Sequence, residues 1–436
     1  MADYGHGDLS WWSKSRFGMF LHFGLYSTAA RQEWVRHFER ISNEAYQKYF
    51  DHFDPDLFDA DEWAYQAKKA GMQYAVLTAK HHEGFCLWDS QYTDYKITNT
   101  PFGRDLVREY CDAFRKHGIH VGLYYSLIDW HHPEFTVDSV HPLRDEPAEM
   151  EKNASRDMKK YAQYMRDQVT ELLTGYGKID VMWFDFSYPA GKYAGWPIGK
   201  GKDDWESEKL VKLIRSLQSH VIIDDRLDLE GAGDFRSPEQ YIPSNGIRDD
   251  AGNLIPWEGC QTFSGAWGYH RGELAWKEPK MLIEMLVRHV SRGGNLLMNV
   301  GPTGRGDFDP KTQECLAVYQ KWMKHHERAI RGCTVPPEEF PEPEGARYTY
   351  NPETKRLYLC MFEWPFKFIH LSGLAGHVEY AQLLNDASEI PFRDMDVPVG
   401  NMTERAPKNA ITLELPVTRP DFEVPVIELF LKDGRS

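Results

Sequence analysis

The sequence lacks several features that would place the protein in other classes. No stretch of the 436-residue chain contains the ~18 consecutive apolar residues of a membrane-spanning helix. The first residues show no basic segment leading into an apolar run and no small-residue cleavage site, so we expect no secretory signal and a cytoplasmic protein. Lys and Arg number 51 against 66 Asp and Glu and do not cluster, which argues against nucleic acids and anionic membranes as partners.

Motifs for disulfides, metals and dinucleotides are missing as well. The six cysteines are scattered without a CxxC spacing, which predicts reduced core thiols. No HxxxH, HExxH or strand-borne HxH pattern occurs, so we expect no metal and no other cofactor, and a metal-dependent amidohydrolase-like barrel is disfavoured. No GxGxxG follows the first predicted strand, which argues against a dinucleotide-binding sheet.

Aromatic residues are abundant, with 14 Trp, 23 Tyr and 23 Phe. Aromatic rings on a pocket wall stack on the C–H faces of sugars, but they also fill large cores. Their positions along the chain must decide between the two interpretations.

Most of the chain alternates short apolar runs with helix-patterned stretches. Strands are predicted at 19–24, 74–79, 120–126, 180–186, 221–226 and 295–301, with a weaker one at 261–265. Helices are predicted at 59–70, 105–117, 154–176, 204–219, 277–292 and 310–329. This alternation indicates a parallel sheet, either open or closed.

A closed barrel is favoured because polar and aromatic residues follow nearly every predicted strand, where barrel active sites are assembled. We expect an α/β fold with a (β/α)8-like, TIM-type barrel at 1–335. Only six or seven units can be counted, which predicts a missing or irregular helix. The Pro/Glu-rich segment 336–345 is predicted to be a linker, and the short strand-like runs of 346–436 predict a small antiparallel β-sandwich.

The residues at the predicted strand exits suit a sugar site. Imidazole and indole groups can bind vicinal hydroxyls without carrying a fixed charge, although any single His also has a plain packing interpretation. The candidates at these exits are His22, Glu33, Trp34, His81, His82, Tyr124, Tyr125, Arg226 and Trp267.

Asp185 is the most distinctive carboxylate. It ends the apolar run VMWF, where an unpaired charge is costly, although a helix N-cap is an alternative. Cleavage of a glycosidic bond needs two carboxyl groups, one that attacks or activates water and one that protonates the leaving oxygen. Glu239 and Glu258 both follow at suitable distances along the chain, and residue type alone does not separate them.

The ordered segments FGMFLHFG, QEW, TAKHHEGFCLWDS, YYSLIDW, DVMWFDF, DDR, DFRSPEQY and GGNLLMNVGPTGRG resemble glycoside hydrolase family 29, the α-L-fucosidases. The resemblance implies a retaining mechanism with Asp185 as nucleophile and Glu239 as acid/base, with Glu258 as the alternative acid/base. It also implies that the strand-exit residues line a fucose subsite, with one of Tyr124 and Tyr125 among them and Trp267 against the methyl side of the sugar. On physical grounds we expect Arg226 or a nearby His to keep Asp185 ionised. Many members have Gly, or a small residue and then Gly, after the nucleophile. Phe186 and Ser187 stand here instead, which predicts a different leaving-group side.

Two other functions remain open on the sequence. One is a barrel glycosidase for a related sugar such as galactose, which differs from fucose chiefly by a 6-hydroxyl. The other is a catalytically weak sugar-binding protein, which the presence of both carboxylates disfavours. In each case the expected partner is a small carbohydrate.

Overall fold

The amino-terminal part of the protein is built on a curled parallel sheet. The computed structural model describes residues 4–192, 195–395 and 409–432. Seven strands follow the order β5-β4-β3-β2-β1-β7-β6, and every neighbouring pair is parallel. Their bounds are β1 Phe17–Leu21, β2 Tyr74–Lys80, β3 His120–Ser126, β4 Val181–Asp185, β5 Ile222–Ile223, β6 Glu258–Thr262 and β7 Asn295–Val300. The strands are almost entirely buried, which confirms the prediction of a sheet covered on both faces.

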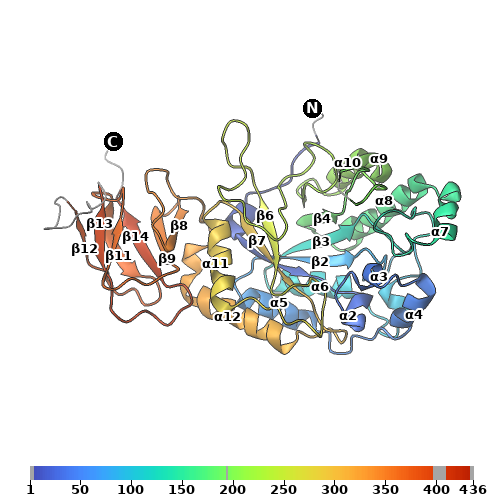
Figure 1. Cartoon of the computed structure of the whole chain (residues 1–436), viewed down its shortest axis with the longest axis horizontal. Helices are drawn as coiled ribbons and strands as arrows, with labels where there is room; N and C mark the ends of the chain where they lie inside the picture. Colours follow the sequence, from blue (N-terminus) through green and yellow to red (C-terminus); the bar gives the residue numbers. More distant parts are fainter. Residues whose placement is uncertain (1–3, 193–194, 396–408, 433–436) are drawn as a thin grey trace.

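Six longer helices run outside the sheet in Figure 1: α5 Ala60–Lys69, α6 Leu106–Lys116, α8 Met158–Gly175, α10 Ser207–Leu217, α11 Pro279–Val290 and α12 Pro310–His326. Asp59, Asp105, Asp157 and Asp309 cap four of them by accepting backbone N–H bonds, which explains where these helices begin. The shorter helices are α1 Trp12–Ser15, α2 Leu25–Ala29, α3 Val35–Phe38, α4 Asn43–Asp51, η1 Ile97–Asn99, α7 Pro147–Glu151, η2 Lys152–Ser155, α9 Lys202–Trp205 and η3 Glu327–Ala329.

An irregular segment, residues 234–240, bridges the two edges of the sheet. The Asp234 amide donates to the Ile223 carbonyl of β5, and Arg236 and Glu239 form parallel bridges with Trp257 and Cys260 at β6. No helix lies between β5 and this segment, or between this segment and β6, although all of these residues are described. The prediction of an irregular barrel is therefore confirmed, and the irregularity lies between β5 and β6.

The carboxyl-terminal part contains two antiparallel sheets, ordered β10-β13-β12 and β11-β14-β9-β8. Their strands are β8 Ala346–Asn351, β9 Arg356–Met361, β10 Phe368–Leu371, β11 Val378–Leu383, β12 Phe392–Asp394, β13 Ile411–Glu414 and β14 Val426–Leu431. Both sheets contribute to one apolar core, which confirms the predicted β-sandwich.

The sandwich packs against α11 and α12 of the barrel (Figure 1). The Trp322 indole N–H of α12 donates to the Val424 carbonyl at 2.8 Å, and Arg328 pairs with the buried Glu428 of β14. The boundary at 336–345 stays a prediction. In this segment Phe340 joins the sandwich core, and Glu342 pairs with Arg292, which follows α11.

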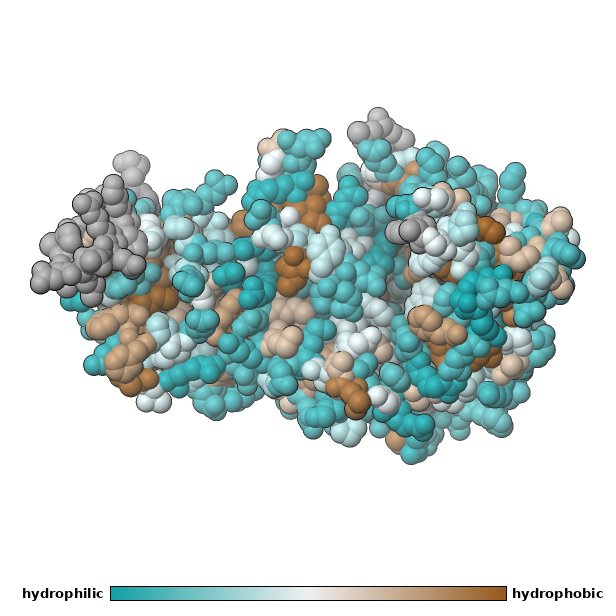
Figure 2. Space-filling model, in the orientation of Figure 1, coloured by the Kyte–Doolittle hydropathy of each residue, from teal (hydrophilic) through white to brown (hydrophobic). Residues whose placement is uncertain are grey.

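The face of the molecule drawn in Figure 2 is predominantly polar. On the face shown in Figure 2, hydrophobic side chains are scattered among hydrophilic ones. Within the described ranges, no helix combines the length and apolar character needed to cross a bilayer.

Candidate active site

A cavity lies at the carboxyl ends of the barrel strands, where barrel enzymes place their chemistry. Residues from β1 to β6 and from the loops that follow them form its wall. The lining residues are Phe20, His22, Trp34, His81, His82, Tyr124, Trp183, Asp185, Phe186, Arg226, Glu239, Cys260 and Trp267.

Two carboxylates converge on one guanidinium nitrogen in this cavity. Arg226 Nη1 lies 2.7 Å from Asp185 Oδ1 and 2.8 Å from Glu239 Oε2. Two atoms bound to one nitrogen are separated by no more than the sum of their distances to it, so these oxygens lie within 5.5 Å of each other. Retaining glycosidases hold their two carboxyl groups ~5–5.5 Å apart, whereas inverting enzymes need ~6.5–9.5 Å.

The two carboxyl groups differ in exposure. Asp185 ends β4, and its side chain is 13% exposed, while the Glu239 side chain is 42% exposed. The Tyr124 hydroxyl donates to Asp185 Oδ2 at 2.9 Å, so both oxygens of Asp185 are bound. Arg226 and this hydrogen bond hold the carboxyl group in a fixed orientation toward the cavity.

The DDR sequence after β5 fixes the segment that carries Glu239. Asp225 Oδ1 accepts hydrogen bonds from the Ser237 amide and hydroxyl at 3.0 and 2.6 Å. Arg226 donates from Nη2 to the Ser237 carbonyl at 3.1 Å, and its guanidinium stacks over the Trp183 ring. These contacts replace the missing helix as the support that holds Glu239 opposite Asp185.

Three buried histidines also line the cavity, and His82 Nε2 lies 3.9 Å from Asp185 Oδ2. His22 Nδ1 lies 2.6 Å from Asn299 Oδ1, and His82 Nδ1 lies 2.6 Å from the Ser126 hydroxyl oxygen. Burial lowers the pKa of His22 to about 3 and lowers the pKa values of His81 and His82 well below their usual range. These imidazoles are therefore neutral at physiological pH.

The neutral histidines have nitrogens available for a ligand. The Asn299 amide group donates to the Trp267 carbonyl, so its oxygen accepts from His22 Nδ1–H and leaves His22 Nε2 as an acceptor. His81 Nδ1 is buried and has no hydrogen-bond partner among the described residues. A buried nitrogen without a partner costs free energy.

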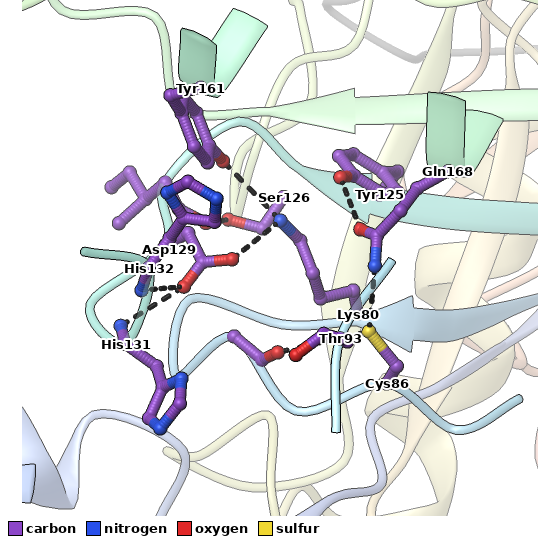
Figure 3. A network of polar contacts seen from close by, with 12 residues as sticks. Lys80, Cys86, Thr93, Tyr125, Ser126, Asp129, His131, His132, Tyr161 and Gln168 are labelled. Atoms are coloured by element: carbon purple, nitrogen blue, oxygen red, sulfur yellow. Dashed lines mark hydrogen bonds and ion pairs between the residues drawn. The ribbon is translucent and has the colours of Figure 1, made fainter. Parts of the chain in front are cut away.

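A polar network behind the cavity holds the histidine loop (Figure 3). The buried Lys80 ammonium at the end of β2 lies 3.0 Å from Asp129 Oδ2 and over the ring of Tyr125. Asp129 Oδ1 accepts from the backbone amides of His131 and His132. The neighbouring Trp130 amide donates to the His82 carbonyl at 2.9 Å. The Lys80–Asp129 pair thereby ties the loop after β3 to the loop that carries His81 and His82.

Two candidates lie behind the cavity wall or outside it. Glu33 Oε2 accepts from the backbone amides of Trp267 and Gly268 at 3.1 and 2.7 Å, so Glu33 fixes the loop that presents Trp267. Burial raises the pKa of Glu33 to about 7. Tyr125 points to the opposite face of β3, where its hydroxyl donates to Gln168 of α8, so its placement in the sugar site is corrected. Successive residues of a strand face opposite sides, and Tyr124 is the one inside.

Glu258 lies at the start of β6, beneath the cavity. Its carboxyl group accepts hydrogen bonds from the Tyr74 hydroxyl and from the Trp183 indole N–H. It is fully buried and does not line the cavity, and burial raises its pKa to about 7. This geometry favours Glu239 over Glu258 as the group that faces a leaving oxygen.

Four residues of the wall were not among the candidates from sequence: Phe20, Trp183, Phe186 and Cys260. Phe20 and Trp183 sit within β1 and β4, and their inward direction follows only from the register of the barrel. The sequence did point to position 186, because Phe186 stands where many family members have Gly or a small residue. Among the described residues, no group of His, Cys, Asp and Glu could hold a metal ion.

A pair of carboxyl groups in a cavity lined by aromatic and imidazole rings, at the carboxyl ends of barrel strands, is typical of a glycoside hydrolase. Comparison with known proteins narrows the class. The family model described as alpha-L-fucosidase matches residues 7–328, so the chain belongs to the α-L-fucosidase family.

Solved structures agree over almost the whole chain. Alpha-L-fucosidase isoenzyme 1 from Paenibacillus thiaminolyticus is 43% identical, with a TM-score of 0.89 and coverage of 98% of this chain and 99% of that one. A Bacteroides thetaiotaomicron α-L-fucosidase, solved as a trapped covalent intermediate with 2-fluoro-fucosyl fluoride, is 26% identical with a TM-score of 0.82 and covers 99% of both chains. The Dictyostelium discoideum alpha-L-fucosidase is 27% identical over 96% of this chain and 91% of its own length. The resemblance found in the sequence motifs is confirmed.

Proposed function

We propose that the protein is a retaining exo-α-L-fucosidase that removes terminal α-L-fucose from fucosylated oligosaccharides or glycoconjugates. The observation that carries this proposal is the pair of carboxyl oxygens, from Asp185 and Glu239, held within 5.5 Å by Arg226. That spacing leaves room for direct attack on the sugar and too little for an intervening water. The trapped intermediate of the Bacteroides relative supports the same chemistry.

In the first step an oxygen of Asp185 attacks C1 of the fucosyl group while the bond from C1 to the leaving oxygen breaks. Glu239 donates its proton to that oxygen, and the leaving group departs as an alcohol. The result is a covalent ester between Asp185 and the sugar. Because Asp185 then carries no charge, Arg226 interacts with Glu239 alone, and the ionised form of Glu239 is favoured.

In the second step Glu239 removes a proton from a water molecule, and the water oxygen attacks C1. The ester bond to Asp185 breaks, and fucose leaves with its original anomeric configuration. The Tyr124 hydroxyl, 2.9 Å from Asp185 Oδ2, stabilises the carboxylate that reappears.

His22, His81, His82 and Trp34 bind the fucose hydroxyls in this proposal, and Trp267 packs against the apolar methyl side. The Trp267 ring lies 5.2 Å from His22 and 6.1 Å from Phe20, centroid to centroid, so it forms a wall next to the hydroxyl-binding groups. A galactose 6-hydroxyl at this wall would lose its water without a partner, which costs binding free energy.

The test compares two aryl glycosides that differ in this group. We expect hydrolysis of 4-nitrophenyl α-L-fucoside, with EDTA having no effect, and kcat/KM lower by about 100-fold on 4-nitrophenyl α-L-galactoside. Equal or higher activity on the galactoside would contradict the assignment of fucose. Binding of free fucose without turnover of either glycoside would indicate a sugar-binding protein.

A further inference from the structure

The residue after the proposed nucleophile has an unusual backbone. Phe186 has φ 80°, in the left-handed region that favours glycine. Among the described residues, Phe186 is the only aromatic residue with a positive φ. A bulky side chain in this conformation costs free energy that the surrounding structure must offset, and such positions concentrate at functional sites.

The strained backbone places the Phe186 ring among aromatic neighbours. Its centroid lies 5.1 Å from the Trp34 ring and 5.7 Å from the Trp196 ring. Trp34 lines the sugar cavity, whereas Trp196 lines a second, open groove next to it. Phe186 lines both, so an aromatic wall continues from the sugar cavity into the groove.

The position of Glu239 identifies the groove as the leaving-group side. Asp185, Arg226 and Glu239 lie where the cavity and the groove meet. An acid must reach the leaving oxygen, so a leaving group extends past Glu239 into the groove. The groove beyond carries charged groups, among them Asp228, Glu230 and Arg236, that suit sugar hydroxyls.

We propose that Phe186 is a specificity-determining residue whose ring forms a platform for leaving groups with a flat apolar face, such as a pyranose or an aryl ring. This inference rests on the proposed fucosidase function and adds the chemistry of the leaving-group side. The strain at Phe186 is the cost of placing a ring where glycine would leave a gap.

The experiment compares leaving groups with and without a ring. Kinetics of the wild type and of F186G, F186L and F186Y are measured on 4-nitrophenyl α-L-fucoside, on an α-L-fucosylated disaccharide that the wild type cleaves, and on α-L-fucosyl fluoride. Fluoride is too small to touch the platform. F186G relieves the backbone strain, F186L keeps the strain without the ring, and F186Y keeps both.

We expect F186G and F186L to lower kcat/KM about tenfold further on the aryl and disaccharide substrates than on the fluoride. F186Y should stay within about twofold of the wild type on all three. Equal losses of kcat/KM on all substrates would show that Phe186 acts on Asp185 or the sugar cavity. An unchanged kcat/KM on all three substrates would contradict the proposed platform. A loss confined to the aryl substrate would overturn the assignment for sugars. A wild type inactive on both the aryl fucoside and the fluoride would overturn the fucosidase function itself, and the platform with it.

Discussion

The two halves of the barrel rim differ in regularity and in charge. The half formed by β1 to β3 presents buried histidines whose pKa values are lowered by burial, fixed by hydrogen bonds to neighbouring strands and loops. The half formed by β4 to β6 presents Asp185, Arg226 and Glu239 on backbone that departs from the repeating pattern, next to an open groove.

This difference shows that one barrel places sugar recognition and bond cleavage on different parts of its rim. Neutral groups held rigidly can select hydroxyl positions without disturbing the charges that change during the reaction. The charged half must admit a leaving group and a water, and its irregular segment lets Glu239 be more exposed than Asp185. We therefore expect substitutions in the charged half to reduce turnover with little loss of stability, and substitutions beneath the histidine half to reduce stability.

The largest effect is expected for Asp185→Ala. Removing the nucleophile should lower kcat on an aryl α-L-fucoside by about 10³-fold or more while the fold remains, because Glu239, the proposed acid, is the only other carboxylate among the described residues that line the cavity. Added azide should restore turnover and give the β-fucosyl azide, since azide enters from the side that Asp185 leaves empty. Near-wild-type activity of a folded variant would remove Asp185 from the mechanism.

Glu239→Ala should lower kcat by about 10²–10³-fold on a substrate with a poor leaving group and by less on an activated aryl fucoside. Azide should rescue this variant with the α-fucosyl azide as product, because it attacks the intermediate. Glu258→Gln is the matched control, and it should keep most of the activity because Glu258 lies beneath the cavity. If azide rescued a Glu258 variant and failed to rescue Glu239→Ala, the general acid would be Glu258.

Lys80→Met tests the support of the histidine half. Lys80 and Asp129 are both buried, so the variant leaves a buried carboxylate without its cation and should destabilise the protein by about 3–5 kcal/mol. Urea unfolding measures this, and the double variant Lys80→Met/Asp129→Asn should recover part of the loss. A loss below about 1 kcal/mol would show that the pair does not support this half.

For Glu258→Gln we also expect a changed pH dependence of the free energy of unfolding. The folded protein keeps the Glu258 proton up to about pH 7, whereas the unfolded chain releases it near 4.5. The wild type therefore loses this contribution as the pH rises from 4.5 to 7, and the glutamine variant does not. Relative to the wild type, the variant should gain about 3 kcal/mol over that interval and stay level above it. A difference that is flat from pH 4.5 to 7 would contradict the raised pKa.

Much of the regular half was predictable from the sequence. The strand predicted at 120–126 agrees with β3, and the helices that start after Asp59 and Asp105 carry their caps in the sequence. Asp185 was predictable as well, because a single carboxylate at the end of an apolar strand indicates a functional role for that side chain.

The irregular half was less predictable, for physical reasons. The predicted strand 221–226 is reduced to β5, because the chain turns after Ile223 and Asp224 accepts the Phe184 amide. The segment 234–240 has no strand periodicity and is held by backbone bridges to β6 and by the side chains of Asp225 and Arg226. Choosing between Tyr124 and Tyr125, or between Glu239 and Glu258, requires the register of the barrel and not the type of residue.

The most direct test of the account is covalent labelling of the nucleophile. The wild type is incubated with a 2-deoxy-2-fluoro-α-L-fucosyl fluoride, which forms the ester and hydrolyses slowly, and its peptides are analysed by mass spectrometry. The account predicts one fluorofucosyl group per chain, attached to Asp185, and none in Asp185→Ala. A label on Glu239 or on any other residue would contradict it.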